Sequence, residues 1–233
     1  MKAFYKFIIL FSLSINICQI LSLATSPWVK PWPNCEVPFQ IFPSHPYREK
    51  ILVILNEFET KTRIKFVEKQ NSHKSWININ YNPLEGNYSQ YLGYTGFAYN
   101  LNIKSYRIAH ELGHALGFIH EHQRSDRDNW LELIDANFRP NEDHSQIKNK
   151  LETTPITNYD INSIMHYWCS AGATKLKWYE WLIFTDNYNG EHITLVYKPN
   201  RSLKFNTNEK LSQLDIEGIN KFYNDCSLKI MDQ

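Results

Sequence analysis

Three histidines in the middle of the chain are spaced so that one metal ion could bind all of them. His110 and His114 lie four residues apart in a segment, residues 106–116, whose apolar residues recur at helical intervals, so their rings leave one helix face a turn apart. Gly117 follows where the helix should end, because glycine tolerates the positive φ of a sharp turn. That turn would bring His120 to the first two histidines, and this ligand set predicts a catalytic Zn²⁺ site.

Glu111 lies beside the first ligand, where a general base would act. The full pattern H-E-x-x-H-x-x-G-x-x-H is far more specific than H-E-x-x-H alone. A competing interpretation is a helix with surface histidines and an ordinary glycine cap, which explains the helix but not His120. Ser105, just upstream, is expected to be the N-cap of this helix.

The size and charge of the chain indicate a globular protein that does not bind nucleic acid. Its 233 residues fit one domain, or two lobes that share a cleft. The formal net charge is +1, and without Lys2 and Lys6 the chain has 23 basic and 24 acidic residues. This balance gives no support to a nucleic-acid partner.

Residues 1–24 are typical of a secretory signal peptide, which leaves a domain of residues 25–233. Lys2 and Lys6 precede an apolar run, and Ser22 and Ala24 are small residues placed for cleavage. A membrane anchor is the alternative, but polar residues interrupt the run. We therefore expect a secreted, extracellular protein without stable membrane association.

Apolar patterning predicts strands and helices on both sides of the histidine segment. A strand, a helix and three strands precede it, and the strand–helix–strand order among them implies a parallel crossover; a hairpin and a final helix follow it. The expected strands are residues 36–42, 63–67, 75–81 and 97–103, the helices are 47–62 and 212–222, and the hairpin is 178–197.

Two segments together resemble the astacin family of zinc metalloendopeptidases, within the metzincins. The first segment matches the family's extended signature at His110, Glu111, His114, Gly117, Phe118, His120, Glu121, Arg124, Asp126 and Arg127. The second, residues 163–167, is similar to the Met-turn, in which Met165 would lie beneath the zinc site and Tyr167 would reach the metal. Weaker matches extend the resemblance over residues 32–226.

The resemblance implies a two-lobed α/β (α+β) fold and a peptidase mechanism. A twisted mixed sheet and long helices would lie above a cleft, with an irregular C-terminal lobe below, and a protein or peptide substrate would lie extended along an edge strand. One Zn²⁺ per chain would activate water, with Glu111 as general base. Tyr167 would be a fifth ligand that stabilises the oxyanion; a packed core tyrosine is the alternative. Met165 would support the site without ligating.

The resemblance also suggests a structural role for Glu121. The family's glutamate at this position binds the mature N-terminus in a buried ion pair. A typical propeptide with an inhibitory aspartate is not recognisable upstream, so we expect signal cleavage near Ala24 to free that N-terminus without a conventional latent form. Four further histidines, His122, His144, His166 and His192, fall outside the ligand pattern and are expected to be surface or structural residues.

The cysteines depart from the family pattern. Arg63, Tyr88 and Asn102 stand near positions where the family has disulfide cysteines, whereas Cys226 matches one. Because parallel neighbouring strands begin at the same sheet edge, Cys35 should lie near Arg63, which predicts a Cys35–Cys226 disulfide. Cys169 is then an odd thiol, either inert or a zinc ligand in a latent state.

Other features leave the substrate and the modifications open. Asn87 and Asn200 begin possible N-glycosylation sequences, and Trp168 replaces a small residue beside the cleft. We expect a monomer. The leading interpretation is an endopeptidase acting on proteins; a catalytically inactive astacin-like binding module and a hydrolase of non-peptide amides are the alternatives.

Overall fold

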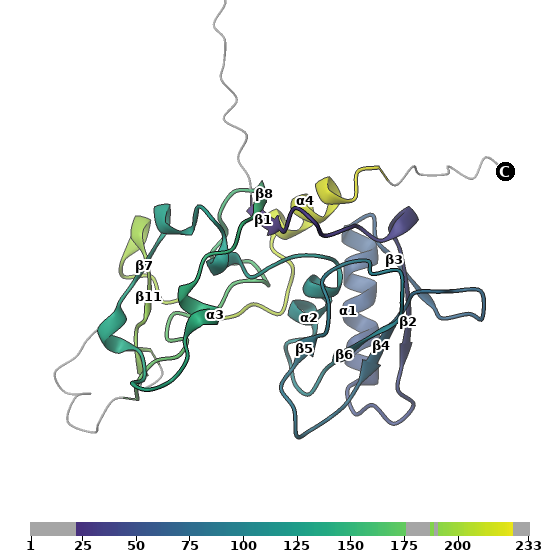
Figure 1. The fold of residues 1–233 in the computed structure, drawn as a ribbon, viewed down its shortest axis with the longest axis horizontal. Coiled ribbons are helices and arrows are strands. Elements are labelled where there is room, and N and C mark those ends of the chain that lie inside the picture. Colours follow the sequence, from purple (N-terminus) through teal and green to yellow (C-terminus); the bar gives the residue numbers. More distant parts are fainter. Residues whose placement is uncertain (1–21, 176–186, 189–190, 226–233) are drawn as a thin grey trace, which may run out of the picture.

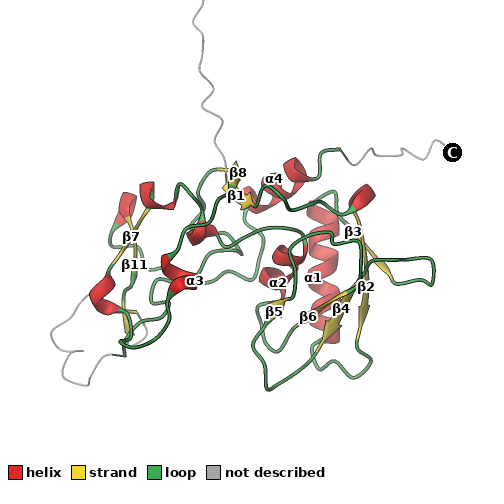
Figure 2. Cartoon of the chain, in the orientation of Figure 1, coloured by secondary structure: helices red, strands yellow, loops and turns green. Residues whose placement is uncertain are grey.

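The computed structural model describes residues 22–175, 187–188 and 191–225, which form two lobes (Figure 1). One lobe contains a sheet with helices packed on it, and the other is mostly loop (Figure 2). Each lobe has its own cluster of buried apolar side chains. This architecture confirms the predicted two-lobed α/β fold with a mixed sheet.

A five-stranded sheet forms the centre of the first lobe, in the order β3-β2-β4-β6-β5. The neighbours β2/β3, β2/β4 and β4/β6 are parallel, and only the edge strand β5 is antiparallel to its neighbour β6. In β4 the alternation predicted from sequence is present, because Ile77 and Ile79 are buried. The strands are β2 (Glu36–Ile41), β3 (Lys65–Glu68), β4 (Ile77–Asn80), β5 (Tyr88–Ser89) and β6 (Tyr99–Asn102).

Three helices pack into the core of this lobe: α1 (Arg48–Lys61), α2 (Ile108–Ala115) and α4 (Gln213–Phe222). The α4 helix begins with a capping box, in which the Ser212 hydroxyl accepts from the Asp215 amide and the Asp215 carboxylate accepts from the Ser212 amide. The prediction that Ser105 caps α2 was wrong. Arg107 is the N-cap, without a side-chain cap, because the Ser105 hydroxyl is occupied by the side-chain amide of Asn87.

The second lobe is built from short elements around buried residues such as Leu131 and Leu195. Here β7 (Leu131–Leu133) pairs with β11 (Leu195–Tyr197). The helix α3 (Ser145–Lys148) adds Ile147 to the same buried cluster and lies on the side of this lobe toward α2 in Figure 1. Of the predicted hairpin, β9 (Asn187–Tyr188) and β10 (Glu191–His192) are present, and residues 178–186 lie outside the described residues. The short 3-10 helices are Pro33–Cys35, Glu121–Gln123, Arg127–Asn129, Asp135–Asn137 and Lys198–Asn200.

A strand at the start of the described chain connects the two lobes. This strand, β1 (Ser22–Thr25), pairs with β8 (Thr154–Thr157), and its residues Leu23 and Ala24 are buried. The domain boundary expected after Ala24 therefore falls inside a folded strand, while the signal peptide itself stays a prediction. None of the described helices has the length and hydropathy needed to cross a bilayer.

The described cysteines are consistent with the predicted pairing. Cys35 is disulfide-bonded, and Cys169 is a free, buried thiol, so the partner of Cys35 lies outside the described residues, as Cys226 does. The Sγ atom of Cys35 is 3.4 Å from the carbonyl oxygen of Tyr223, and Arg63 donates to the carbonyl oxygen of Asn224. The start of β2 therefore lies beside the chain leading to Cys226, and the Cys35–Cys226 bond stays a prediction.

Candidate zinc site

The helix α2 and the turn after it bring three histidine side chains together. The Nε2 atom of His120 lies 3.1 Å from that of His114 and 3.2 Å from that of His110. All three ligand atoms lie within 4.8 Å of one another. The turn depends on Gly117, whose φ is +106°, as the sequence predicts.

Each imidazole is oriented by a hydrogen bond on its far side. The Nδ1 atoms of His110 and His114 face the carbonyl oxygens of Ile164 and Phe118 at 2.6 and 2.8 Å, and that of His120 faces the Gln123 side-chain oxygen at 2.8 Å. A carbonyl only accepts, so each Nδ1 carries the proton and each Nε2 presents a lone pair. Three lone pairs converging on one point repel unless a cation lies between them, which is the donor set that Zn²⁺ takes.

Burial keeps these rings neutral. It lowers the pKa of His114 to about 4, and it lowers the pKa values of His110 and His120 as well, with further lowering from the neighbouring histidines. Only the neutral imidazole binds a metal. The site is therefore ready for a cation at neutral pH.

The carboxylate of Glu111 is buried beside the histidines and is held by the edge strand. Burial raises its pKa to about 8, while the charge of Arg107 and a hydrogen bond from the Ser89 backbone amide oppose that rise. Arg107 and Ser89 line a cleft of about 580 Å³ together with Glu111 and the three histidines. A carboxyl group with a pKa near neutrality can exchange a proton with substrate or water.

Tyr167 lines the same cleft and lies in a cluster of rings beside the histidines. Its ring centroid is 4.5 Å from that of His120 and 4.2 Å from that of His122. Trp168 stacks on it at 5.5 Å, and the guanidinium of Arg107 lies 4.6 Å over Trp168. Burial raises the pKa of Tyr167, so at neutral pH its hydroxyl is a hydrogen-bond donor.

Met165 lies beneath the helix that bears the ligands. It is fully buried, and a Cβ atom placed on Gly113 would be only 2.3 Å from its Sδ atom. Gly113 lies between His110 and His114, so the Met-turn touches the backbone of α2 between the two ligands. The Met165 carbonyl also accepts from the amide of Glu121, directly after the third histidine.

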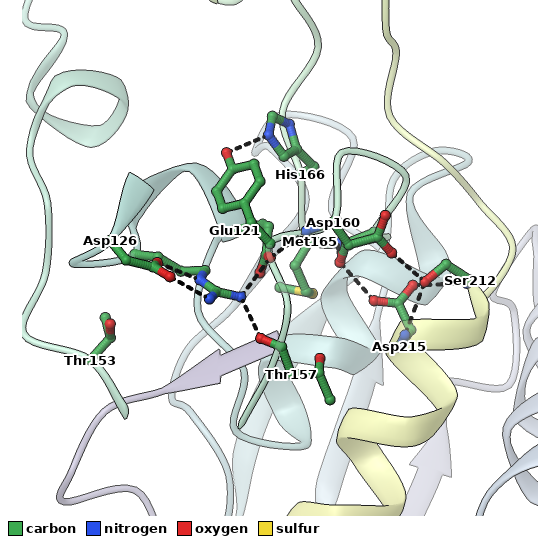
Figure 3. Close-up of polar contacts among 12 residues, drawn as sticks. Glu121, Asp126, Thr153, Thr157, Asp160, Met165, His166, Ser212 and Asp215 are labelled. Atoms are coloured by element: carbon green, nitrogen blue, oxygen red, sulfur yellow. Dashed lines mark hydrogen bonds and ion pairs between the residues drawn. The ribbon is translucent and has the colours of Figure 1, made fainter. Parts of the chain in front are cut away.

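Glu121 belongs to a buried network of charged side chains (Figure 3). Its Oε1 atom accepts from Arg124 and from the Asp160 amide, each at 2.9 Å, and Arg124 also binds Asp126 and the Thr157 carbonyl. The Oε2 atom of Glu121 is buried without a partner among the described residues. Burial raises the pKa of Glu121 to about 8, against the opposing effect of Arg124.

The network continues into the cap of α4 (Figure 3). The Ser212 hydroxyl donates to Asp160 at 2.6 Å, and Asp215 accepts from the Ser163 hydroxyl and the Ile164 amide. Asp215 thereby connects α4 to the Met-turn, and burial raises its pKa to about 6.

The other histidines hold structural hydrogen bonds. His122 and His144 bind carbonyl oxygens of Gln146 and Arg139, and His166 lies between the Tyr159 hydroxyl and the Tyr167 carbonyl. His192 lies in β10. None of these four belongs to the histidine cluster, which agrees with the structural role expected for them.

Sequence reasoning missed three groups at the site. The Gln123 side chain orients His120, and it could have been suspected from its place three residues after the ligand. Arg107 lies at the N-cap of α2, one turn before Glu111, without a motif to mark it. The Ser89 amide is a backbone group, which no residue type reveals.

The fold and the site together define a metallopeptidase-like protein with a histidine metal centre in a cleft between two lobes. The family model that describes the astacin peptidases matches residues 24–224. The chain therefore belongs to the astacin family, as the sequence motifs indicated.

Individual relatives agree with this assignment. The chain is 31% identical over 213 residues to zinc metalloproteinase nas-14 of Caenorhabditis elegans, covering 87% of this chain and 39% of that protein. It is 31% identical to the low choriolytic enzyme of Oryzias latipes over 205 residues, covering 82% of this chain and 68% of that protein. The chain thus spans well under half of nas-14.

A solved structure shows the same fold. High choriolytic enzyme 1, a hatching enzyme zinc-protease from Oryzias latipes, superposes with a TM-score of 0.66 at 29% identity, covering 84% of this chain and 94% of that one. The printed names of nas-14 and of high choriolytic enzyme 1 describe zinc proteases, which fits the histidine cluster found in this chain.

Proposed function

We propose that this protein is a secreted zinc endopeptidase that cleaves peptide bonds in proteins. The observation that carries the proposal is the convergence of three Nε2 lone pairs at 3.1–3.2 Å beside the buried carboxyl of Glu111. His110, His114 and His120 would hold one Zn²⁺ per chain. When bound, Zn²⁺ acidifies a coordinated water and polarises the scissile carbonyl.

Glu111 is the general base of this proposal. Its carboxylate takes a proton from the attacking water and later delivers it to the leaving amine. The Ser89 amide and Arg107 favour the ionised form, which is the form that accepts the proton, and burial favours the protonated form, which donates it. Because these influences oppose each other, Glu111 can be either ionised or protonated near neutral pH.

Tyr167 is the oxyanion donor. Its phenol is kept protonated, and its ring is supported by Trp168 on one side and by His122 on another. A positioned hydroxyl that donates to the developing oxyanion stabilises the transition state more than the substrate. The substrate backbone would extend along β5, whose free edge faces the cleft.

Glu121 supports a proposal about the start of the mature chain. In β1, Ser22 lies opposite Thr157, whose carbonyl binds the Arg124 guanidinium that also binds Glu121. An α-amino group freed near Leu23 would lie on the strand that pairs with Thr157, and it is the group we expect to bind the Oε2 atom of Glu121, which has no partner among the described residues. We therefore expect processing slightly before the predicted site, and N-terminal sequencing of active, secreted protein tests it. A start at Thr25 in fully active protein would contradict it.

The function is tested by digestion of casein or gelatin with purified protein. We expect cleavage by the wild type, none with a zinc chelator, and recovery when zinc is restored. Glu111→Ala should keep its zinc and lose most turnover. Undiminished cleavage by that variant would refute the general-base role.

A protein-binding module without activity is the second candidate. Wild-type protein that contains zinc and cuts neither substrate would favour this candidate. The present site argues against it, because the ligands and the base are all present and aligned.

A further inference from the structure

The edge strand that borders the cleft is too short to hold itself in place. β5 consists of two residues, Tyr88 and Ser89, paired antiparallel to Asn102 and Leu101 of β6. Yet β5 lines the cleft beside Glu111, and the Ser89 amide faces the Glu111 carboxyl closely enough to favour its ionised form, so a small shift of β5 would change the surroundings of the general base. Something other than strand pairing must fix this segment.

Asn102 fixes the loop that leads into β5. Its side chain is buried, and its Nδ2 group donates to the carbonyl oxygens of Gly86 at 2.7 Å and Asn82 at 3.3 Å. Its Oδ1 atom accepts from the Asn82 amide at 2.7 Å. One side chain therefore binds both ends of the loop of residues 82–86.

Asn87 fixes the other side of the same segment. Its Oδ1 atom accepts from the amides of Lys104 and Ser105 at 2.7 and 3.2 Å, and its Nδ2 group donates to the Ser105 hydroxyl at 2.8 Å. Ser105 lies three residues before the start of α2, the helix that bears Glu111. Asn87 thus joins the beginning of β5 to the segment that leads into α2.

Only an amide suits position 102. Its side chain donates through nitrogen and accepts through oxygen, whereas an aspartate would place a carboxylate oxygen against the Gly86 carbonyl, where neither group can donate. A buried carbonyl left without a donor is destabilising. At position 87 the partner of the amide nitrogen is the Ser105 hydroxyl, which can also donate, so an aspartate there would keep the contacts.

We propose that Asn87 and Asn102 form an asparagine clip that positions β5, and through the Ser89 amide positions Glu111 for proton transfer. The proposal rests on the proposed peptidase function. The two asparagines are positioning residues, since they act on the reaction only through the edge strand. The clip fixes β5 through directional hydrogen bonds, a role that a longer strand or a covalent cross-link could also fill.

The first test compares Asn87→Ala and Asn102→Ala with Asn100→Ala. Asn100 lies on β6 but is exposed, and its side chain binds Asn80 away from the cleft. We expect kcat/KM to fall about tenfold to a hundredfold in both clip variants, mostly in kcat, with no change in zinc content, and to stay unchanged in Asn100→Ala. A host that does not N-glycosylate excludes an effect of a glycan at Asn87.

The second test replaces the clip with a covalent bond. Tyr88 and Asn102 are directly opposite in the antiparallel ladder, where Cα separations of about 4.5–5.5 Å suit a disulfide. Asn102→Cys alone should be impaired. The oxidised double variant, Tyr88→Cys with Asn102→Cys, should have a kcat close to that of Tyr88→Cys alone. A reductant that leaves the wild type active should lower the kcat of the double variant again.

Amide hydrogen exchange gives a result that does not depend on activity. The Ser89, Lys104 and Ser105 amides should exchange at least about tenfold faster in Asn87→Ala than in the wild type, because the loss of the clip opens the segment locally. Folded, zinc-loaded clip variants with wild-type kcat and unchanged exchange would overturn the proposal. If the wild type cleaves nothing, the peptidase proposal fails, and the exchange experiment still decides whether the clip holds β5.

Discussion

Adding one methyl group at Gly113 should separate the Met-turn from the helix that bears the zinc ligands. The Cβ atom of an alanine there would lie 2.3 Å from the Sδ atom of Met165 and 3.4 Å from Ile164 Cδ1. Carbon and sulfur need about 3.5–4 Å, so Met165 or α2 must move by more than about 1 Å. Met165 is fully buried and has little space to move into.

The magnitude follows from two opposing effects. Alanine stabilises a helix interior by about 1 kcal/mol relative to glycine, and overpacking a buried contact costs about 1–3 kcal/mol or more. We expect a net loss of about 1–2 kcal/mol for Gly113→Ala, which lowers Tm by about 2–4 °C per kcal/mol in a chain of this size. Because His110 and His114 flank Gly113, zinc affinity should also fall, by about tenfold to a hundredfold.

Thermal unfolding of the apo protein and zinc competition with a chelator measure the two effects separately. Gly86→Ala is the control, since nothing lies within 4 Å of a Cβ atom there, and it should leave both quantities nearly unchanged. In a double-mutant cycle, Gly113→Ala with Met165→Ala should be less destabilised than the sum of the single variants. Two results would show that the contact between residue 113 and Met165 is not the cause. One is strict additivity of the two unfolding free-energy changes, and the other is a Gly113→Ala variant with wild-type stability and zinc affinity.

Three further substitutions test the site and its support. Arg124→Met should cost about 1–3 kcal/mol of unfolding free energy, because it leaves the buried Glu121 carboxyl and the Thr157 carbonyl without the Arg124 donor, and adding Glu121→Gln should recover part of it; equal stability of Arg124→Met and wild type in denaturant titrations would contradict this. Burial raises the pKa of Asp215 from 3.8 to about 6, so the folded state binds the proton more tightly, and stability should fall by about 3 kcal/mol in all as pH rises from about 3 to about 7. Asp215→Asn should flatten that part of the stability curve, and parallel curves for the two proteins would show that another group titrates. Tyr167→Phe should lower kcat about a hundredfold or more while KM and zinc content change little, and a kcat within twofold of wild type would remove Tyr167 from the mechanism.

The sequence predicted the groups whose identity is set by spacing along one element. The histidines of α2 and the positive φ of Gly117 follow from local pattern, whereas the burial of Met165 was expected only from the resemblance to the Met-turn. The apolar pattern of residues 212–222 likewise predicted α4, whose Ser212 and Asp215 form a capping box. For α2, Gly117 and α4 the geometry depends on near neighbours in the chain.

The features that were missed depend on contacts between distant segments. Ser105 was expected to be the N-cap of α2, but its hydroxyl accepts a hydrogen bond from the side chain of Asn87, eighteen residues earlier. Ser22–Thr25 belongs to an apolar run typical of a signal peptide, and only its pairing with β8 makes it a strand. The irregular second lobe gave few predictions for the same reason, since its short strands β7 and β11 are more than sixty residues apart.

The charged network explains how such distant segments could control the zinc site. Glu121 directly follows the third ligand, and its carboxylate joins Arg124 to the Asp160 amide. Asp160 in turn binds Ser212, the cap of α4, whose Asp215 holds the Met-turn amide at Ile164. Since the Ile164 carbonyl orients His110, the first and third ligands are positioned by two ends of one buried network. A chain start that bound Glu121 would act on the same network, so processing at β1 would be coupled to ligand geometry without direct contact with the metal.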